Sequence, residues 1–232
     1  MNLIAIDTAT EACSVALWRS DGELQELYEL APRAQAQRLL PMIDRLLAEA
    51  GLGRGDLDAV AVGRGPGSFT GVRLAISVAQ GLALGLGLPV LAISSLAALA
   101  QAEAEHYPNA TLLACIDARM GEVYAGCYRV GANGQVGLAA AEAVGPAGQV
   151  ALAEGDDWVV LGTGWASYAD ALRARIGIPR FADGARYPRA AMIARLAAAA
   201  WARGEGVAAE LALPVYLRDK VALTVAERSL VS

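Results

Sequence analysis

Residues 63–73 read Gly-Arg-Gly-Pro-Gly-Ser-Phe-Thr-Gly-Val-Arg, a glycine- and hydroxyl-rich segment between two apolar runs. The run before it, residues 57–62, predicts a short buried strand, and apolar residues at helical spacing predict a helix over residues 72–86. The segment therefore lies at a helix N-terminus, where free backbone N–H groups favour an anion or another polar partner. Ser68 and Thr70 are the candidate caps of that helix.

Two interpretations of this segment stay open. In the first it binds a phosphate, although it lacks the Gly-x-x-x-x-Gly-Lys-Ser/Thr spacing of a P-loop and the only lysine is Lys220. In the second it is a structural turn through which a helix of small residues packs tightly against its neighbours. Spacing alone favours the structural turn slightly.

The composition is that of a globular protein with a full core. The chain has 232 residues, of which 56% are hydrophobic, and a net charge of −5. This charge offers no broad basic face, so RNA is expected to be held only through a partner. Cys13, Cys115 and Cys127 form no Cys-x-x-Cys pair, and a strand-like run begins directly after Met1, so we expect a cytoplasmic protein. The apolar residues 74–94 are interrupted by glycines and a proline, which predicts a helix, a turn and a strand and no membrane span.

The chain contains a repeated pattern of strand, acid, turn and strand. Residues 3–8 form an apolar run that includes Asp7, and the strands predicted over residues 13–18 and 24–30 complete an antiparallel meander. The same order returns half a chain later, in a run that ends at Asp117. This repeat predicts a duplicated α/β domain.

The remaining pattern completes two similar lobes. It predicts an amphipathic helix over 33–50, a strand over 135–141, a helix over 146–154, a strand over 158–161 and a helix that follows Gly162. We expect one lobe over residues 1–105 and another over residues 106–232, with a late helix near 189–203 packing back on the first lobe.

Two such lobes with acid-tipped hairpins at a cleft form the architecture of actin, sugar kinases and 70-kilodalton heat-shock chaperones. Asp7 and Asp117 are then either cleft acids that hold a phosphate-bound metal or strand-end acids satisfied by backbone amides. The residues expected to face a nucleotide or phosphate are Asp7, Thr8, Gly65, Gly67, Ser68, Thr70, Gly71, Asp117, Gly162 and Gly164.

Four segments together carry a family resemblance. Residues 4–10, 63–73, 116–124 and 214–218 closely resemble the TsaB family, also named YeaZ, and the match runs from residue 2 to about residue 220. The resemblance implies a two-lobed actin-like fold of duplicated ribonuclease-H-like domains. It also implies a place in the bacterial machinery that makes N6-threonylcarbamoyladenosine in tRNA.

The resemblance further implies a division of labour. In that family the transfer is catalysed by a paralogue, TsaD, through a metal-binding His-x-x-x-His pair, whereas the only histidine here is His106. The chain is thus expected to be a non-catalytic subunit, without catalytic or metal-binding residues, that binds and stabilises TsaD together with TsaE. No cofactor is expected to be required by this chain, and ATP or ADP in the complex stays open. Alone, the chain is expected to form a homodimer and to bind no membrane.

The first two long helices are the predicted partner surface. One is amphipathic. The next has apolar or small residues almost all round, so its apolar surface is larger than one face of a sheet would cover. The alternative is that this second helix is enclosed within its own lobe. The predicted interface residues are Leu39, Leu40, Ile43, Leu47, Arg73, Ile76, Ala79, Gln80 and Ala83.

Three other functions are alternatives to the scaffold. A nucleotide-dependent enzyme of the sugar-kinase or actin type would use the phosphate-facing residues named above. A protease acting on TsaD would use Ser68 as nucleophile, but its surroundings are not a nucleophile elbow, and neither His106 nor Lys220 is an obvious base. A free-standing RNA-binding module is disfavoured by the net acidity. Residues 219–232 predict no structure.

Overall fold

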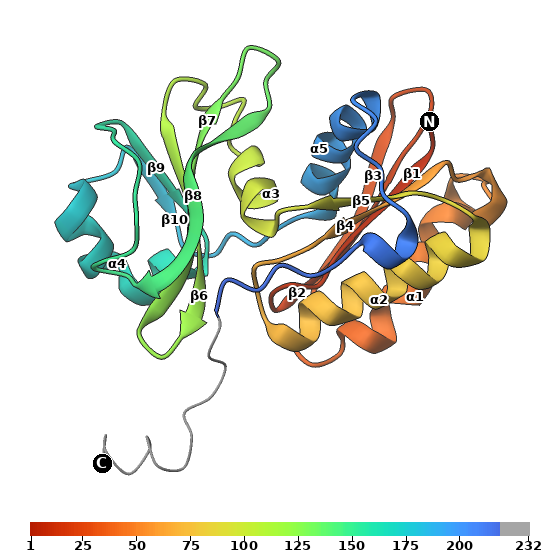
Figure 1. Cartoon of the computed structure of the whole chain (residues 1–232), viewed down its shortest axis with the longest axis horizontal. Helices are drawn as coiled ribbons and strands as arrows, with labels where there is room; N and C mark the ends of the chain where they lie inside the picture. The colour runs from red at the N-terminus through yellow and green to blue at the C-terminus, as the bar shows by residue number, and fades with distance from the viewer. Residues whose placement is uncertain (219–232) are drawn as a thin grey trace, which may run out of the picture.

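The structure is a computed structural model that describes residues 1–218 (Figure 1). The last segment of the sequence, residues 219–232 with Lys220, lies outside the described residues. The described chain forms two lobes, each built around a five-stranded sheet. The prediction of a two-lobed, actin-like α/β fold is confirmed.

The first sheet combines an antiparallel meander with two parallel strands, in the order β3-β2-β1-β4-β5. β1 (Leu3–Asp7), β2 (Ala12–Trp18) and β3 (Leu24–Leu30) form the meander. β4 (Ala59–Gly63) and β5 (Val90–Ile93) continue the sheet parallel to β1. β1 is buried along its whole length, because helices cover both faces of the sheet.

The second sheet repeats this topology, in the order β10-β9-β6-β7-β8. β6 (Thr111–Arg119), β7 (Glu122–Val130) and β8 (Val136–Pro146) form the second meander. β9 (Trp158–Leu161) and β10 (Phe181–Asp183) extend it parallel to β6. The sequence repeat therefore corresponds to a duplicated fold.

Helices cover the two sheets in layers (Figure 1). α1 (Gln35–Glu49) and α2 (Phe69–Leu86) lie together on one face of the first sheet, and α5 (Ala190–Ala202) covers the other. α3 (Ser95–Gln101) and α4 (Thr163–Ile176) pack on the second sheet. The predicted lobe boundary between residues 105 and 106 stays a prediction.

Two short 3-10 helices complete the described structure. They are η1 (Arg54–Asp56), before β4, and η2 (Ala209–Leu211), which packs against α2.

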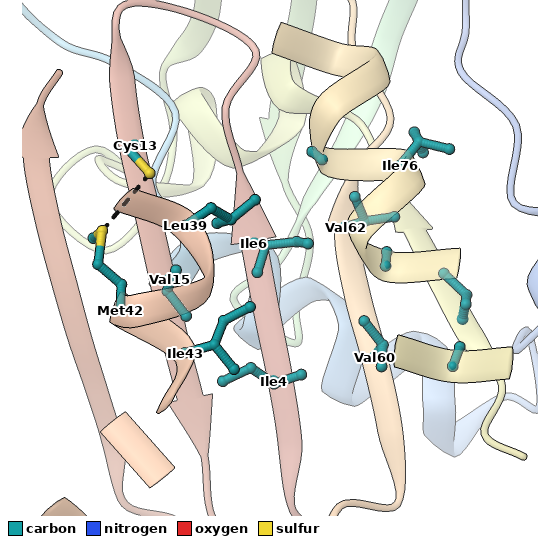
Figure 2. Close-up of a cluster of buried hydrophobic side chains, with 14 of the residues drawn as sticks. Ile4, Ile6, Cys13, Val15, Leu39, Met42, Ile43, Val60, Val62 and Ile76 are labelled. Atoms are coloured by element: carbon teal, nitrogen blue, oxygen red, sulfur yellow. Dashed lines mark hydrogen bonds between the residues drawn. The ribbon is translucent and has the colours of Figure 1, made fainter. Parts of the chain in front are cut away.

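The core between the first sheet and its two long helices follows from strand alternation. Figure 2 shows Ile4 and Ile6 of β1 pointing toward Leu39 and Ile43 of α1. Leu3 and Ala5 belong to the separate core cluster on the other face of the sheet, together with apolar residues of α5. Neighbouring residues of a strand point to opposite faces, so one apolar strand serves two cores.

Among the helices of residues 1–218, one is long and apolar enough to cross a membrane: α2, with a mean hydropathy of 1.4 over 18 residues. It packs on β4 and β1 through a buried face that includes Val72, Ala75, Ile76, Ala79 and Ala83. The apolar residues of this face therefore serve the core of the first lobe.

The predicted helix over residues 146–154 is wrong. β8 continues to Pro146 because it pairs with β7 along its length, ending with Pro146 opposite Glu122. A turn follows, and Val150 and Leu152 pack on the second core from irregular backbone. The strand ladder includes only the first residue of the predicted helix. The other residues form a turn and irregular backbone whose apolar side chains pack on the second core, so helical periodicity did not decide their structure.

Candidate functional site: the cleft between the lobes and the glycine-rich turn

A cleft of about 1350 Å³ lies between the two lobes. The first lobe lines it with the β1–β2 turn and the start of α2, including Glu11, Gly67 and Ser68. The second lobe lines it with the end of β6 and the start of α4, including Asp117 and Ser167. The duplicated hairpins therefore face each other, as the two-lobed architecture predicts.

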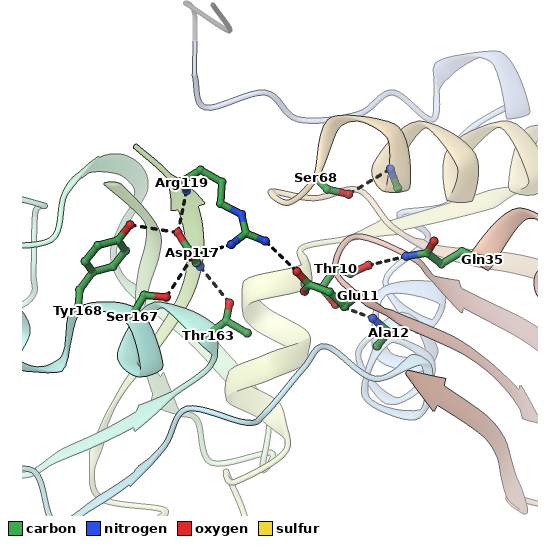
Figure 3. Close-up of polar contacts among 11 residues, drawn as sticks. Thr10, Glu11, Ala12, Gln35, Ser68, Asp117, Arg119, Thr163, Ser167 and Tyr168 are labelled. Carbon is green, nitrogen blue, oxygen red and sulfur yellow. Dashed lines mark hydrogen bonds and ion pairs between the residues drawn. The ribbon is translucent and has the colours of Figure 1, made fainter. Parts of the chain in front are cut away.

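Of the two predicted cleft acids, Asp117 lines the cleft, and both of its carboxylate oxygens accept hydrogen bonds (Figure 3). Its Oδ1 accepts hydrogen bonds from the backbone N–H of Arg119 at 2.7 Å and from the Tyr168 hydroxyl at 3.3 Å. Its Oδ2 accepts from the Ser167 hydroxyl at 3.1 Å and from the Arg119 guanidinium at 3.1 Å. These four donors use the acceptor capacity that a metal ion would need.

Arg119 connects the two lobes. One guanidinium nitrogen contacts Asp117, and the other donates to Glu11 Oε1 at 3.0 Å, across the cleft (Figure 3). The backbone of Arg119 has φ of 65°, a left-handed conformation that is uncommon outside glycine. This conformation belongs to the tight turn between β6 and β7 that carries the side chain.

Asp7 occupies the matching position in the first lobe but does not reach the cleft. Only 1% of its surface is exposed, and its Oδ2 accepts from the Ser95 hydroxyl at 2.8 Å. Its Oδ1 accepts from the Ala9 backbone N–H at 2.9 Å. Burial raises the pKa of Asp7 to about 6, against the opposing effect of these two hydrogen bonds. Asp7 therefore has the environment of a strand-end acid, whose carboxylate is satisfied within the protein.

This pKa shift predicts a pH dependence of stability. Between pH 4 and pH 6 the folded state binds more protons at Asp7 than the unfolded state, so stability falls as pH rises through this window. We expect the free energy of unfolding of the wild type to fall by about 3 kcal/mol relative to Asp7→Asn between about pH 4 and pH 7. Urea unfolding at several pH values measures this difference, with the exposed Asp170→Asn as the control. Parallel stability profiles for Asp7→Asn and the wild type would contradict the assignment.

The glycine-rich turn packs against the β1–β2 turn. A Cβ on Gly67 would lie 2.4 Å from the Ala9 carbonyl oxygen, and a Cβ on Gly71 would lie 1.9 Å from the Thr8 carbonyl oxygen. Hydrogen bonds fix the same contact, since the Ser68 N–H donates to Ala9 at 2.7 Å and the Thr8 hydroxyl donates to the Gly71 carbonyl at 2.7 Å. These glycines thus allow close backbone approach, in agreement with the structural-turn interpretation.

Ser68 has the role of a helix cap. Its Oγ accepts a hydrogen bond from the Gly71 N–H at 3.2 Å at the start of α2. No histidine, aspartate or glutamate of residues 1–218 is hydrogen-bonded to this hydroxyl. His106 has a side chain that is 71% exposed and lies 3.4 Å from Glu103. The arrangement has no nucleophile paired with a base.

The second lobe uses glycines in the same way. A Cβ on Gly162, which has φ of 105°, would lie 2.3 Å from the Cys115 carbonyl oxygen, and Gly164 also packs on Cys115. Between them, Thr163 Oγ1 accepts from the Asp117 backbone N–H at 3.0 Å. The first glycine segment therefore packs a helix start onto the turn after β1, and the second packs a helix start onto β6.

Three of the ten residues expected to face a phosphate line the cleft, namely Gly67, Ser68 and Asp117. Among the described residues, the other seven do not line it: Asp7, Thr8, Gly65, Thr70, Gly71, Gly162 and Gly164. Within residues 1–218 no three His, Cys, Asp or Glu side chains come together as a metal-binding group.

The two residues that connect the lobes were not among the site residues predicted from the sequence. Glu11 and Arg119 lie in the two matching hairpin turns, shortly after Asp7 and Asp117. The repeat itself was the available signal, because corresponding turns of duplicated lobes face each other at the cleft. With the two turns facing each other, the opposite charges of Glu11 and Arg119 would have predicted an ion pair between the lobes.

The predicted interface residues divide into two groups. Leu40, Arg73 and Gln80 keep part of their surface exposed. The other six lie in the core of the first lobe, where α1 and α2 pack on the sheet: Leu39, Ile43, Leu47, Ile76, Ala79 and Ala83. The amphipathic pattern identified the faces of these helices that pack on their own sheet.

Comparison with known proteins identifies relatives that match nearly the whole chain. The family model for TsaD, a tRNA N6-adenosine threonylcarbamoyltransferase, matches residues 28–224. The TsaB protein of Escherichia coli K12, a tRNA threonylcarbamoyladenosine biosynthesis protein, is 44% identical over 225 residues, which is 96% of each chain. The corresponding protein of Haemophilus influenzae is 39% identical over 229 residues, or 95% of each chain.

A solved structure agrees with these sequence relatives. YeaZ from Pseudomonas aeruginosa is 51% identical and superimposes with a TM-score of 0.87, covering 93% of this chain and 99% of its own. The resemblance stated from four sequence segments is confirmed. This chain belongs to the TsaB (YeaZ) family of tRNA threonylcarbamoyladenosine biosynthesis proteins, within the wider group that the TsaD family model describes.

Proposed function

We propose that this protein is a non-catalytic subunit that binds and activates TsaD, together with TsaE, in the cytoplasmic modification of tRNA. The proposal is supported most directly by the hydrogen bonds that the potentially reactive side chains make within the protein. Asp7, Ser68 and Asp117 are each held by structural hydrogen bonds, and the single histidine is a surface residue. Activation of a partner requires a docking surface and no reactive group of this chain.

The outward side of α2 is the surface that we propose for TsaD. This outer α2 face consists of Arg73, Ser77, Gly81, Leu84 and Gly85, which are all exposed and follow helical spacing. Leu84 is 76% exposed, an unusual position for a leucine unless it meets a partner. Serine and glycine side chains allow another helix to approach closely.

The relationship to TsaD gives the partner a compatible shape. Because the TsaD family model matches residues 28–224, TsaD is expected to share the two-lobed fold and to present an equivalent helix. Two such helices packing face to face would form a pseudo-symmetric heterodimer. The same face would pair two copies of this chain when TsaD is absent, so homodimer and heterodimer would compete.

Reconstitution tests this function. The chain alone is expected to give no threonylcarbamoylation of tRNA, and its addition to TsaD, TsaE and a threonylcarbamoyl-adenylate source is expected to restore activity. Robust modification without TsaD would overturn the proposal. Calorimetry with ATP and magnesium is expected to show no binding to the chain alone, and strong binding would favour the nucleotide-dependent enzyme instead.

Ser68→Ala separates the scaffold from a protease. Loss of the N-cap is expected to lower the free energy of unfolding by about 1 kcal/mol while the reconstituted complex keeps its activity. Thermal unfolding and the tRNA assay measure the two effects on one preparation. Thr70→Ala, which removes a neighbouring exposed hydroxyl without a capping bond, is the control. Loss of complex activity in Ser68→Ala at normal stability would support a nucleophilic role.

A further inference from the structure

We propose that the two lobes are latched across the mouth of the cleft by two ion pairs, Arg119 with Glu11 and Arg218 with Glu122, which hold the free chain at one lobe separation. Each pair joins a residue carried by the first lobe to one carried by the second, and they lie on separate segments. Such a latch does not depend on the proposed function, because it acts within the isolated chain.

The first pair is prearranged by its surroundings. Asp117 holds the Arg119 guanidinium at 3.1 Å, and Ser167 and Tyr168 hold the Asp117 carboxylate in turn (Figure 3). Arg119 then reaches Glu11 at 3.0 Å. A side chain that is already ordered loses less conformational entropy when it forms one more ion pair. The guanidinium also neutralises acids from both lobes that would otherwise repel each other across the cleft.

The second pair ends a strap formed by residues 207–218. Val207 pairs with Val90 at the edge of the first sheet, and the Gln80 side chain donates to the Ala212 carbonyl at 3.1 Å. The Val215 N–H then donates to the Arg64 carbonyl at 2.9 Å. The strap is thus fixed to the first lobe as far as residue 215.

Beyond that point the strap reaches the other lobe. Tyr216 accepts a hydrogen bond from Arg73 at 2.6 Å and packs on Phe69, still on the first lobe. Two residues later, Arg218 pairs with Glu122 at the start of β7, in the second lobe. Val215, Tyr216 and Arg218 all line the cleft, so the strap passes along its mouth.

A third contact holds the opposite side of the cleft, where the chain passes from β5 to α3. Glu142 of β8 has a largely buried side chain and accepts hydrogen bonds from the Tyr128 hydroxyl at 2.5 Å and from the Ser94 hydroxyl. Arg64 of the first lobe lies 3.8 Å from the same carboxylate. In the proposed latch this side is the hinge, and the two ion pairs hold the mouth of the cleft closed.

Exposure determines the strength of the latch. Arg119 is largely exposed, so its pair with Glu11 contributes little and is screened by salt, whereas the less exposed pair of Arg218 with Glu122 is screened less. Removing both pairs is therefore expected to raise the population of open arrangements about tenfold. The latch is thus reversible and sensitive to ionic strength.

Distance measurement between spin labels tests the latch. Ala48→Cys on α1 and Ala174→Cys on α4 place labels at exposed positions of opposite lobes. The native thiols do not compete, because Cys13, Cys115 and Cys127 are buried and burial raises the pKa of each of them. The labelled wild type is expected to give one narrow distance distribution at low salt.

The variants decide the outcome. Arg119→Ala combined with Arg218→Ala is expected to broaden the distribution toward longer distances, whereas Arg203→Ala, which removes an ion pair within one lobe, leaves it narrow. If the double arginine variant fails to fold, Glu11→Gln with Glu122→Gln removes the negative charge from both pairs with side chains of the same shape. An unchanged distribution in the folded variants, or equal broadening in Arg203→Ala, would overturn the latch.

Discussion

Gly71→Ala is expected to destabilise the first lobe by about 3 kcal/mol, although it adds a single methyl group. The new Cβ would lie 1.9 Å from the Thr8 carbonyl oxygen and 2.6 Å from Ser68 Oγ. Thr8 is fully buried in the β1–β2 turn, so its backbone cannot move away without disturbing β1. The hydrogen bond from the Thr8 hydroxyl to the Gly71 carbonyl would be distorted as well.

A matched glycine on the same helix provides the control. Gly85 has open space around its Cβ position and is exposed, so Gly85→Ala is expected to stabilise α2 by up to about 1 kcal/mol through helix propensity. Urea unfolding followed by circular dichroism gives both values. Equal stability of Gly71→Ala and the wild type would show that the turn adapts, and the close-packing explanation of the glycine-rich segment would fail.

Gly81→Glu is expected to weaken the proposed complex with TsaD by about 100-fold or more while the isolated chain stays folded. Gly81 lies in the middle of the outer α2 face with nothing near its Cβ position, so glutamate is tolerated and favours the helix. In the complex its carboxylate would be buried against an apolar, closely packed helix. An unpaired buried charge costs about 3–5 kcal/mol, which corresponds to this loss of affinity.

The control for Gly81→Glu places the same charge elsewhere. Ala174→Glu adds a glutamate at an exposed position of α4, outside the proposed surface, and is expected to leave the affinity for TsaD unchanged. Titration calorimetry with purified TsaD measures both variants, and thermal unfolding confirms that both are folded. Wild-type affinity in Gly81→Glu would place the interface on another surface.

Burial changes which substitutions are informative on this helix. The sequence indicated Ala79 and Ala83 as interface positions because α2 is apolar almost all round. Both are fully buried in the lobe's core, so a charge there would unfold the lobe and would not report on docking. Periodicity identifies an apolar face of a helix, but it does not say whether a sheet or a partner covers that face.

Most elements of the fold could be predicted because their signals are local. The strands over residues 24–30 and 158–161 were predicted at their observed bounds, from apolar runs and turn residues beside them. The prediction of a helix over 146–154 failed because these residues, after the end of β8 at Pro146, form a turn and irregular backbone that packs Val150 and Leu152 on the second core. The spacing of apolar residues shows that side chains are buried but does not by itself fix the backbone that carries them.

The sequence by itself determined the duplicated α/β architecture, the family and the positions of the two repeated acids. Only the tertiary structure decided that these acids differ, since Ser95 and the backbone of Ala9 enclose Asp7 while Asp117 remains at the cleft. It also brought Glu11 to Arg119, which are separated by about half the chain. The physical reason is that burial and ion pairing depend on which elements pack together in space, and local sequence patterns do not encode that packing.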